Sequence, residues 1–255
     1  MWRFLTMTPL AGIGEIAPGA DLAQTVAHAL VASRITVGPY SVVVVAQKIV
    51  SKAEGRIVYL DDVTPSPRAQ ELAAITGKSP ALVELILRES AEVLRVRPNI
   101  LIVRHRLGYV IANAGIDQSN VVGTGGRPVC LLLPEDPEGS ARRVRAGVAA
   151  LGLPAPAVII SDSFGRPWRR GVINVAIGSS GLPALIDRRG DLDRYRRPLR
   201  STEVAFADAL AAAAGIIMGE GDEGTPVVHI GGAEWSLPEN GAIGLIRPIG
   251  EDLFR

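Results

Sequence analysis

The residues best suited to chemistry lie between positions 158 and 171. An apolar, β-branched run at 158–160 predicts a buried strand that ends where a carboxylate and two hydroxyls follow at 161–163. A glycine and a proline then break the pattern, and arginines and a tryptophan fill 166–170. Oxygen ligands beside dense positive charge suit a hard divalent cation that bridges to phosphates. The alternative is that Asp162 caps a turn and the arginines form a solvated rim.

A second stretch with the same character spans residues 113–121. Here an expected strand runs into the carboxylate of Asp117 and several amide and hydroxyl groups, with Gly115 close by. Asn and Asp often form turns by hydrogen bonding to their own backbone, which is the simpler interpretation. Two such strand ends make a shared carboxylate site of Asp117 and Asp162 worth testing.

Three further stretches have the composition of phosphate-binding segments. Residues 12–15 contain two glycines one residue apart, which allow close approach of a ligand, although a simple turn explains them equally well. Residues 47–56 carry Lys48 and Lys52, which would share one helical face, and one of which could bind phosphate; a solvated turn is the alternative. The glycine-rich acidic loop at 219–226 favours a metal–phosphate site over binding of a bare anion.

A mixed α+β fold, with mixed and antiparallel sheets and flanking helices, is expected to position these segments. Strands are expected at 1–10, 41–46, 56–60, 100–104, 109–112, 128–133, 158–161, 174–178, 182–187 and 227–230. Helices are expected at 21–34, 80–95, 140–151 and 201–214. His105 is expected in an exposed hairpin turn, whereas Cys130 and His229 are expected to be structural core residues.

Composition excludes several classes of protein. The chain has 255 residues, a formal net charge of +1 and one cysteine. Neutral charge and few aromatics argue against a nucleic-acid partner, and the arginine-rich segment 188–200 mixes both charge signs. No apolar run approaches the roughly 20 residues that a membrane span needs, so no membrane association is expected. A single cysteine and the lack of a signal peptide pattern favour a reducing cytoplasm.

Taken together, five stretches in chain order carry a resemblance to one family: Gly12 to Glu15, Lys48 to Arg56, Asn113 to Asn120, Ile160 to Arg169, and Met218 to Pro226. They resemble the coenzyme F420:L-glutamate ligases, the γ-glutamyl ligases of deazaflavin coenzyme biosynthesis. The resemblance extends over essentially the whole chain, and the Asn-Ala-Gly-Ile-Asp and Ser-Asp-Ser-Phe-Gly-Arg-Pro-Trp-Arg blocks are long and specific.

The resemblance implies a γ-glutamyl ligase-like fold in a single domain over residues 1–255, or two closely packed subdomains, and a homodimer. It implies that the C-terminal flavin-binding domain of some bacterial relatives is absent here. The implied reaction is GTP-dependent amide-bond formation. The terminal carboxylate of coenzyme F420-0 attacks the γ-phosphate of GTP, and the amine of L-glutamate captures the resulting acyl phosphate.

The resemblance also assigns site residues. It places ligands for two Mg²⁺ or Mn²⁺ ions at Asp117, Asp162, Ser163 and Glu220, and K⁺ is a further candidate cofactor without assigned residues. It places nucleotide contacts at Gly12, Ile13, Gly14, Glu15, Gln47, Lys52, Asn120, Met218, Gly219, Gly221, Asp222, Glu223, Gly224 and Thr225. Ser163 stands where many relatives have threonine, and Gln47 where serine or threonine is common. Charge and placement alone, without the resemblance, make Arg166 and Arg169 catalytic candidates that would bind the phosphodiester or the acyl phosphate.

Two rival functions stay open at this stage. A related nucleotide-dependent amide ligase with a different carboxylate acceptor would share every one of these nucleotide contacts. A non-catalytic nucleotide-binding protein is expected to have lost at least one metal carboxylate, and all three are present here.

Overall fold

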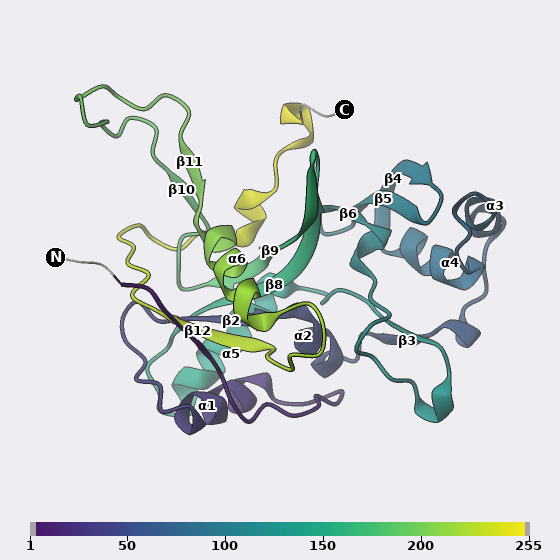
Figure 1. The fold of residues 1–255 in the computed structure, drawn as a ribbon, viewed down its shortest axis with the longest axis horizontal. Helices are drawn as coiled ribbons and strands as arrows, with labels where there is room; N and C mark the ends of the chain where they lie inside the picture. Colours follow the sequence, from purple (N-terminus) through teal and green to yellow (C-terminus); the bar gives the residue numbers. More distant parts are fainter. Residues whose placement is uncertain (1–3, 253–255) are drawn as a thin grey trace.

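A five-stranded sheet forms the centre of the computed structural model, which describes residues 4–252 (Figure 1). Its strand order is β1 (Thr6–Pro9), β12 (Val227–Gly231), β2 (Val42–Ala46), β8 (Ala157–Arg166) and β9 (Arg169–Ser180). Only β2 and β8 run parallel; the other neighbours are antiparallel. The mixed sheet with flanking helices confirms the α+β prediction.

Helices cover both faces of this sheet. The four valines at the start of β2 alternate: Val43 and Val45 face one apolar cluster, while Val42 and Val44 face the other. The first cluster includes α1 (Leu22–Ala32), α2 (Gln47–Ala53) and α5 (Pro137–Ala150), and the second includes α6 (Phe206–Met218). Burial on both faces explains why β2 is apolar at every position.

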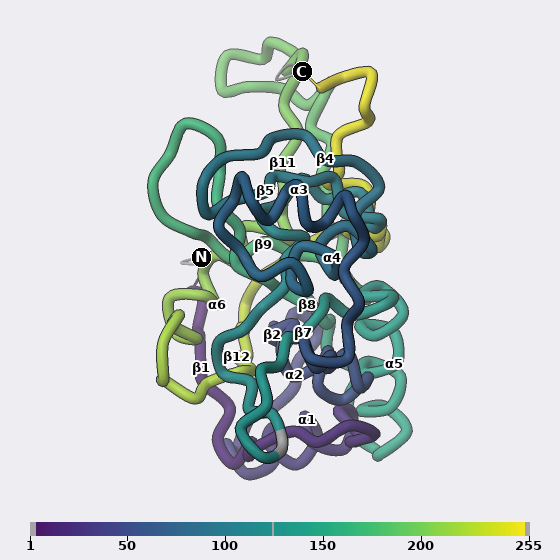
Figure 2. Tube along the Cα trace, turned by 90° about the vertical axis from the view of Figure 1, so that its right-hand side faces the viewer, coloured from purple at the N-terminus to yellow at the C-terminus, as the bar shows by residue number. Residues whose placement is uncertain are grey.

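Two helices of the first layer, α1 and α5, approach each other closely (Figure 2). A Cβ atom on Gly147 would come within 2.4 Å of the Ala23 side chain, so the small residues permit this packing. Asp21 caps α1 by accepting a hydrogen bond from the Gln24 backbone N–H at 3.1 Å, as the sequence predicts.

A third apolar cluster lies beside the sheet, on the right in Figure 1. It is built from α3 (Pro67–Thr76), α4 (Pro80–Arg88) and the antiparallel sheet β4 (Ser90–Arg97), β5 (Ile100–His105) and β6 (Val110–Ala112). A two-stranded sheet of β3 (Ile57–Tyr59) and β7 (Val129–Leu131) connects it to the rest of the chain. Short 3-10 turns are present at Leu60–Asp62, Asn113–Gly115 and Thr124–Gly126.

A separate two-stranded arm extends from the central body at the upper left of Figure 1. It consists of β10 (Leu185–Asp187) and β11 (Glu203–Ala205), joined by the arginine-rich segment 188–202. The chain closes with 3-10 turns at Ala242–Leu245 and Ile249–Glu251. No helix in the described part of the chain is long and apolar enough to cross a membrane.

Several predicted elements need correction. The strand expected to end at Ser161 continues to Arg166, because β8 pairs with β9 through Gly165 and Arg166. Its burial falls after Ser161, so the apolar run stops where the strand leaves the core, before the strand itself ends. The strand expected at 174–178 is likewise part of the longer β9, which continues to Ser180.

The helix predictions fail at three boundaries. The helix expected at 80–95 ends at Arg88, because the following β-branched residues pair as strand β4 with β5. The helix expected at 201–214 begins at Phe206, because 203–205 pair with β10, and helix α3 was not predicted. Helix α5 begins at Pro137, where Asp136 caps it in place of the expected loop.

His105 is also placed differently from the prediction. It belongs to strand β5 and is 0% exposed, whereas an exposed turn was expected. Cys130 and His229 are buried, as predicted. The first three residues of the strand expected at 1–10 lie outside the described residues, and β1 occupies 6–9 of the remainder.

Candidate functional site

The candidate site lies at one edge of the central sheet, where β2 and β8 both end their buried portions. Ala46 pairs with Ser161 in parallel register, so Gln47 and Asp162 follow this last pair side by side, with Gln47 itself still buried. The antiparallel strand β12 begins at the same edge, where the Ala46 backbone N–H donates to Pro226 O at 2.8 Å. The topology therefore brings the loop before β12 to the segments that follow β2 and β8.

The segment that follows β1 reaches this edge as well. The Leu10 backbone N–H donates to Val227 O at 3.0 Å, and residues 12–15 continue from there. The Glu15 carboxylate accepts a hydrogen bond from Lys52 Nζ at 2.5 Å, and Lys52 is buried while Glu15 is exposed. The ion pair joins two stretches that were predicted separately to contact nucleotide.

Asp117 is held at the site by both its backbone and its side chain. Its backbone N–H and C=O are both bonded to Leu131, at 2.9 and 2.8 Å. Gln47 Nε2 donates to its carboxylate at 2.9 Å, and Lys48 Nζ lies 3.5 Å from the same oxygen. Asp117 therefore joins the edge formed by β2 and β8, as the comparison of the two strand ends suggested.

The three predicted metal carboxylates repel one another electrostatically. Burial, together with the charges of Asp117 and Glu220, raises the pKa of Asp162 to about 8, against the lowering effects of the Ser163 amide and Lys48. Burial and Glu220 also raise the pKa of Asp117, while Lys48 and Gln47 oppose the rise. The carboxylates are thus close enough to affect each other's pKa, and Lys48 lowers the pKa of both aspartates.

The donor set suits a hard divalent cation that phosphate oxygens complete. Within residues 4–252, no three His, Cys, Asp or Glu side chains converge closely enough to hold a metal ion by themselves. Mg²⁺ is commonly bound by one or two carboxylates together with substrate phosphates and water. Carboxylates that lie at the same edge and raise one another's pKa fit that mode of binding.

A glycine-rich loop closes one side of the site. It starts at the C-terminus of α6, where Met218 is buried, and runs through Glu220, Asp222, Gly224 and Thr225. Gly219 has φ +70° and ψ −178°, a conformation essentially restricted to glycine.

Two hydrogen bonds hold this loop, one within the loop itself and one from the segment that follows Asp117. The Glu223 carboxylate folds back to accept the Gly221 backbone N–H at 2.8 Å, which helps to lower its pKa. Asn120 Nδ2 donates to Gly221 O at 3.1 Å, so the stretch after Asp117 contacts the loop directly.

The two candidate arginines lie further along the β8–β9 hairpin. Arg166 pairs with Arg169 in the register, at the turn of the hairpin. Four residues of strand separate Arg166 from Asp162, which corresponds to about 13 Å. Arg169 is exposed, and Arg166 Nη1 is a buried nitrogen with no hydrogen-bond partner among the described residues. No described contact joins either arginine to the carboxylates.

Sequence reasoning left two site residues without an assignment. Lys48 was weighed with Lys52 as a phosphate ligand, but only Lys52 was retained; in the structure Lys48 contacts Asp117 and donates to Ser119 Oγ at 2.9 Å. Tyr109 packs edge-to-face on Phe164 at 5.8 Å between ring centroids, two residues from Asp162. The helical spacing of the lysines pointed to the first, whereas no local pattern pointed to the second.

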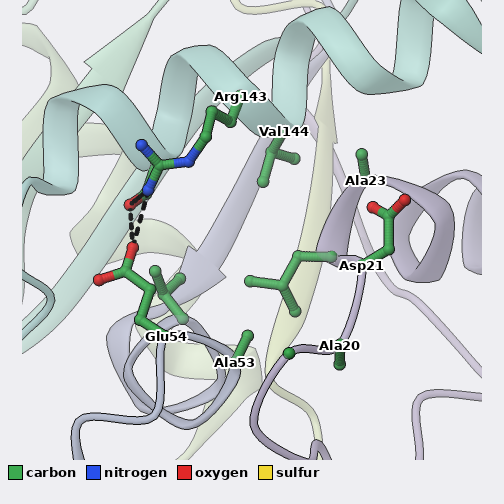
Figure 3. A pocket seen from close by; sticks show the side chains of 11 residues that line it. Ala20, Asp21, Ala23, Ala53, Glu54, Arg143 and Val144 are labelled. Atoms are coloured by element: carbon green, nitrogen blue, oxygen red, sulfur yellow. Dashed lines mark hydrogen bonds and ion pairs between the residues drawn. The ribbon is translucent and has the colours of Figure 1, made fainter.

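Two cavities lie away from the carboxylates. One, of about 310 Å³, lies between α1, α5 and the far end of α2, where Arg143 reaches Glu54 at 2.9 Å (Figure 3). The other, of about 330 Å³, is lined by Tyr40, Ser41 and His229 at the opposite edge of the sheet. Neither cavity contains Asp117, Asp162 or Glu220.

Comparison with known proteins gives consistent matches. The family model described as F420-0:gamma-glutamyl ligase matches residues 12–232. The coenzyme F420:L-glutamate ligase of Methanothermobacter thermautotrophicus is 42% identical over 98% of this chain and 99% of its own length. Its counterpart from Methanopyrus kandleri is 43% identical over 98% of both chains. That of Halobacterium salinarum is 43% identical over 96% of this chain and 93% of its own.

Proposed function

Because the chain belongs to the F420-0:gamma-glutamyl ligase family, we propose that it joins the amine of L-glutamate to the terminal carboxylate of coenzyme F420-0 through an amide bond, and that further glutamates extend the tail through γ-linked bonds. The observation that carries the proposal is the convergence of Asp117, Asp162 and the glycine-rich loop at one sheet edge. Such a constellation suits a nucleotide triphosphate held through a divalent cation.

We further propose GTP as the nucleotide and an acyl phosphate as the intermediate. A carboxylate oxygen of the acceptor would attack the γ-phosphorus, and the bond between that phosphorus and the β-bridging oxygen would break to release GDP. The glutamate amine would then attack the acyl carbon, losing a proton as inorganic phosphate leaves. Neither step needs a protein nucleophile, because phosphoryl transfer depends mainly on positioning and charge neutralisation.

The residues that would hold two Mg²⁺ or Mn²⁺ ions are Asp117, Asp162, Ser163 and Glu220. When bound, the ions would neutralise the charge on the triphosphate. Gln47 orients the Asp117 carboxylate, and Lys48 adds a point charge beside it. We assign K⁺, where it binds, to the same oxygen-rich edge.

The remaining residues would bind the nucleotide and the acceptor. Glu15 positions Lys52, and the glycine-rich loop positions Asn120. The segments that carry these two residues therefore lie at the same edge of the sheet. Arg166 and Arg169, at the hairpin turn, would bind the phosphodiester of the acceptor through charge-assisted hydrogen bonds. This role requires the acceptor to extend from the carboxylates along the hairpin.

We also propose that the chain forms a homodimer. Large apolar side chains project from the two longest hairpin extensions: Trp168 at the β8–β9 turn is 87% exposed, and Tyr195 on the arm is 79% exposed. Exposed aromatic groups of this kind are typical of interfaces. Light scattering after size-exclusion chromatography would give twice the 26.8 kDa chain mass if the proposal is right.

The function is tested by mass spectrometry of a complete reaction. Purified protein, coenzyme F420-0, L-glutamate, GTP and Mn²⁺ should give a product heavier by one or more glutamyl groups, with GDP released only when every substrate is present. Replacing GTP by ATP tests the nucleotide. A related ligase with a different carboxylate acceptor is the alternative, because such an enzyme would use the same nucleotide contacts. Metal-dependent GTP binding without any glutamylated F420-0 would contradict the proposed acceptor.

A further inference from the structure

Strand β9 contains an irregularity beside the candidate site. Ile160 pairs with Gly178 and the next residue, Ser161, pairs with Ala176, so Ile177 has no partner on β8. One extra residue on one strand is a β-bulge, which bends the strand and increases its twist. The bulge lies opposite the step from Ile160 to Ser161, one residue before the hairpin leaves the buried core.

Side chains from two other elements bind the backbone of this bulge. The Tyr109 hydroxyl, from the turn between β5 and β6, donates to Ile177 O at 2.5 Å. The Asp208 carboxylate, from α6, accepts the Ala176 backbone N–H at 2.8 Å. The bulge is therefore bonded from both faces of the sheet, through residues that are 99 positions apart in the chain.

Both contacts are hydrogen bonds between a side chain and the backbone of β9. Tyr109 is largely buried and its ring packs on Phe164, and burial together with nearby carboxylates raises its pKa, so its hydroxyl stays protonated and able to donate. Asp208 is half-buried and has no cation paired with it in the described residues; its described bond is to the Ala176 backbone. Each side chain thus satisfies a backbone group at the irregular position.

These contacts determine how the upper part of the hairpin leaves the sheet. In Figure 1 the β8–β9 hairpin rises away from the five-stranded sheet beyond this level. Asp162 is the second residue of β8 beyond the bulge, and Phe164, which Tyr109 contacts, lies on the same side of β8 as Asp162. A change in the bend would therefore move the Asp162 carboxylate relative to Asp117, which is fixed separately by Leu131 and Gln47.

We propose that Tyr109 and Asp208 are positioning residues that fix the Ile177 bulge and thereby hold Asp162 at the distance from Asp117 that a shared divalent cation requires. The inference rests on the proposed function, because it assumes a cation at this edge. It extends that function to two residues outside the ligand set, one from the turn between β5 and β6 and one from α6.

The test measures Mn²⁺ binding directly, by the loss of the free-ion electron paramagnetic resonance signal, alongside turnover. Tyr109→Phe keeps the ring on Phe164 and removes only the donor to Ile177 O. Supporting contacts around metal ligands contribute roughly 10- to 100-fold in affinity, so we expect Tyr109→Phe to weaken Mn²⁺ binding by about tenfold. Tyr195→Phe, on the exposed arm, is the matched control and should leave binding unchanged.

Two variants of Asp208 test whether a hydrogen-bond acceptor at this position is enough to maintain Mn²⁺ binding. Asp208→Asn keeps a carbonyl oxygen that can accept the Ala176 N–H, and should retain Mn²⁺ affinity within about twofold, whereas Asp208→Ala should weaken binding as Tyr109→Phe does. Circular dichroism before each titration confirms that every variant is folded.

The outcomes separate the inference from the proposed function. Reduced Mn²⁺ affinity in Tyr109→Phe and Asp208→Ala supports the inference even if no glutamylated product forms. Unchanged affinity in both folded variants, with only a lower melting temperature, shows that the contacts are merely structural and overturns it. A wild-type protein that binds no Mn²⁺ overturns both.

Discussion

Glu89 is expected to make the stability of the fold depend on acid. This carboxylate is largely buried and accepts bonds from Arg56 Nη2 at 2.9 Å and Arg106 Nε at 3.1 Å, and His105 Nε2 lies 3.4 Å from it. Because the His105 Nδ1 accepts the Leu107 backbone N–H at 3.0 Å, the imidazole proton lies on Nε2, facing Glu89. The cluster joins the chain just after α2 to the β5–β6 turn.

The magnitude follows from the pKa of Glu89. Burial opposes its ionisation, but His105 and the two guanidinium groups hold its pKa at about 2, against an ordinary value of 4.5. That difference corresponds to about 3 kcal/mol of unfolding free energy. Because the folded-state pKa is lowered, this stability is fully present above the unfolded value of 4.5 and is lost as pH falls toward 2. About 2 kcal/mol of it should be gone by roughly pH 3.

The assay is urea unfolding of the wild type and of Glu89→Gln at pH 6 and pH 3, followed by circular dichroism. The stability gap between them should shrink by about 2 kcal/mol between these pH values, because Gln cannot be protonated in this range. Glu71→Gln is the matched control, since Glu71 forms an exposed pair with Arg68 that contributes at most about 1 kcal/mol. An equal gap at both pH values would refute the account of Glu89.

Three further predictions concern the candidate site. Asp162→Asn should abolish turnover while raising the melting temperature, because it removes a charge that Asp117 and Glu220 repel; retained activity in the assay of glutamylated product would contradict the metal role. Gly219→Ala should cost about 1–3 kcal/mol of unfolding free energy in urea titrations and weaken GTP binding, because a Cβ would lie 2.0 Å from the Glu223 carboxylate in a backbone conformation that only glycine adopts readily. Lys48→Met should lower kcat, while an unchanged kcat would show that its contact with Asp117 serves structure alone.

Local signals in the sequence account for part of the fold and of the candidate site. The valine run of β2 and the cap at Asp21 are local signals, and both are confirmed. The grouping of Asp117 with Asp162 follows from the two strand-end patterns, although only the parallel register of β2 and β8 explains why such segments meet at one edge. Periodicity locates the buried half of β8 and misses the exposed half.

The failures have a common physical cause, which is pairing with a distant segment. Residues 90–97 continue a helical pattern, yet cross-strand contacts such as Val93 with Val103 make them a strand. Residues 203–205 join β10 and thereby delay the start of α6. The bonds from Tyr109 and Asp208 to the bulge are of the same type, since neither could be inferred from its neighbours in sequence.

The three carboxylates are held with very different rigidity, and this suggests how the site works. Asp117 has backbone bonds to Leu131 and a side-chain bond from Gln47, and Asp162 belongs to strand β8 and pairs with Val175 of β9. Glu220 lies exposed in the glycine-rich loop, which Asn120 contacts at Gly221. The fold therefore fixes the two aspartates, while the position of Glu220 depends on a loop. If the loop binds the triphosphate as proposed, that contact would bring Glu220 toward Asp117 and Asp162, whose pKa values its charge already raises.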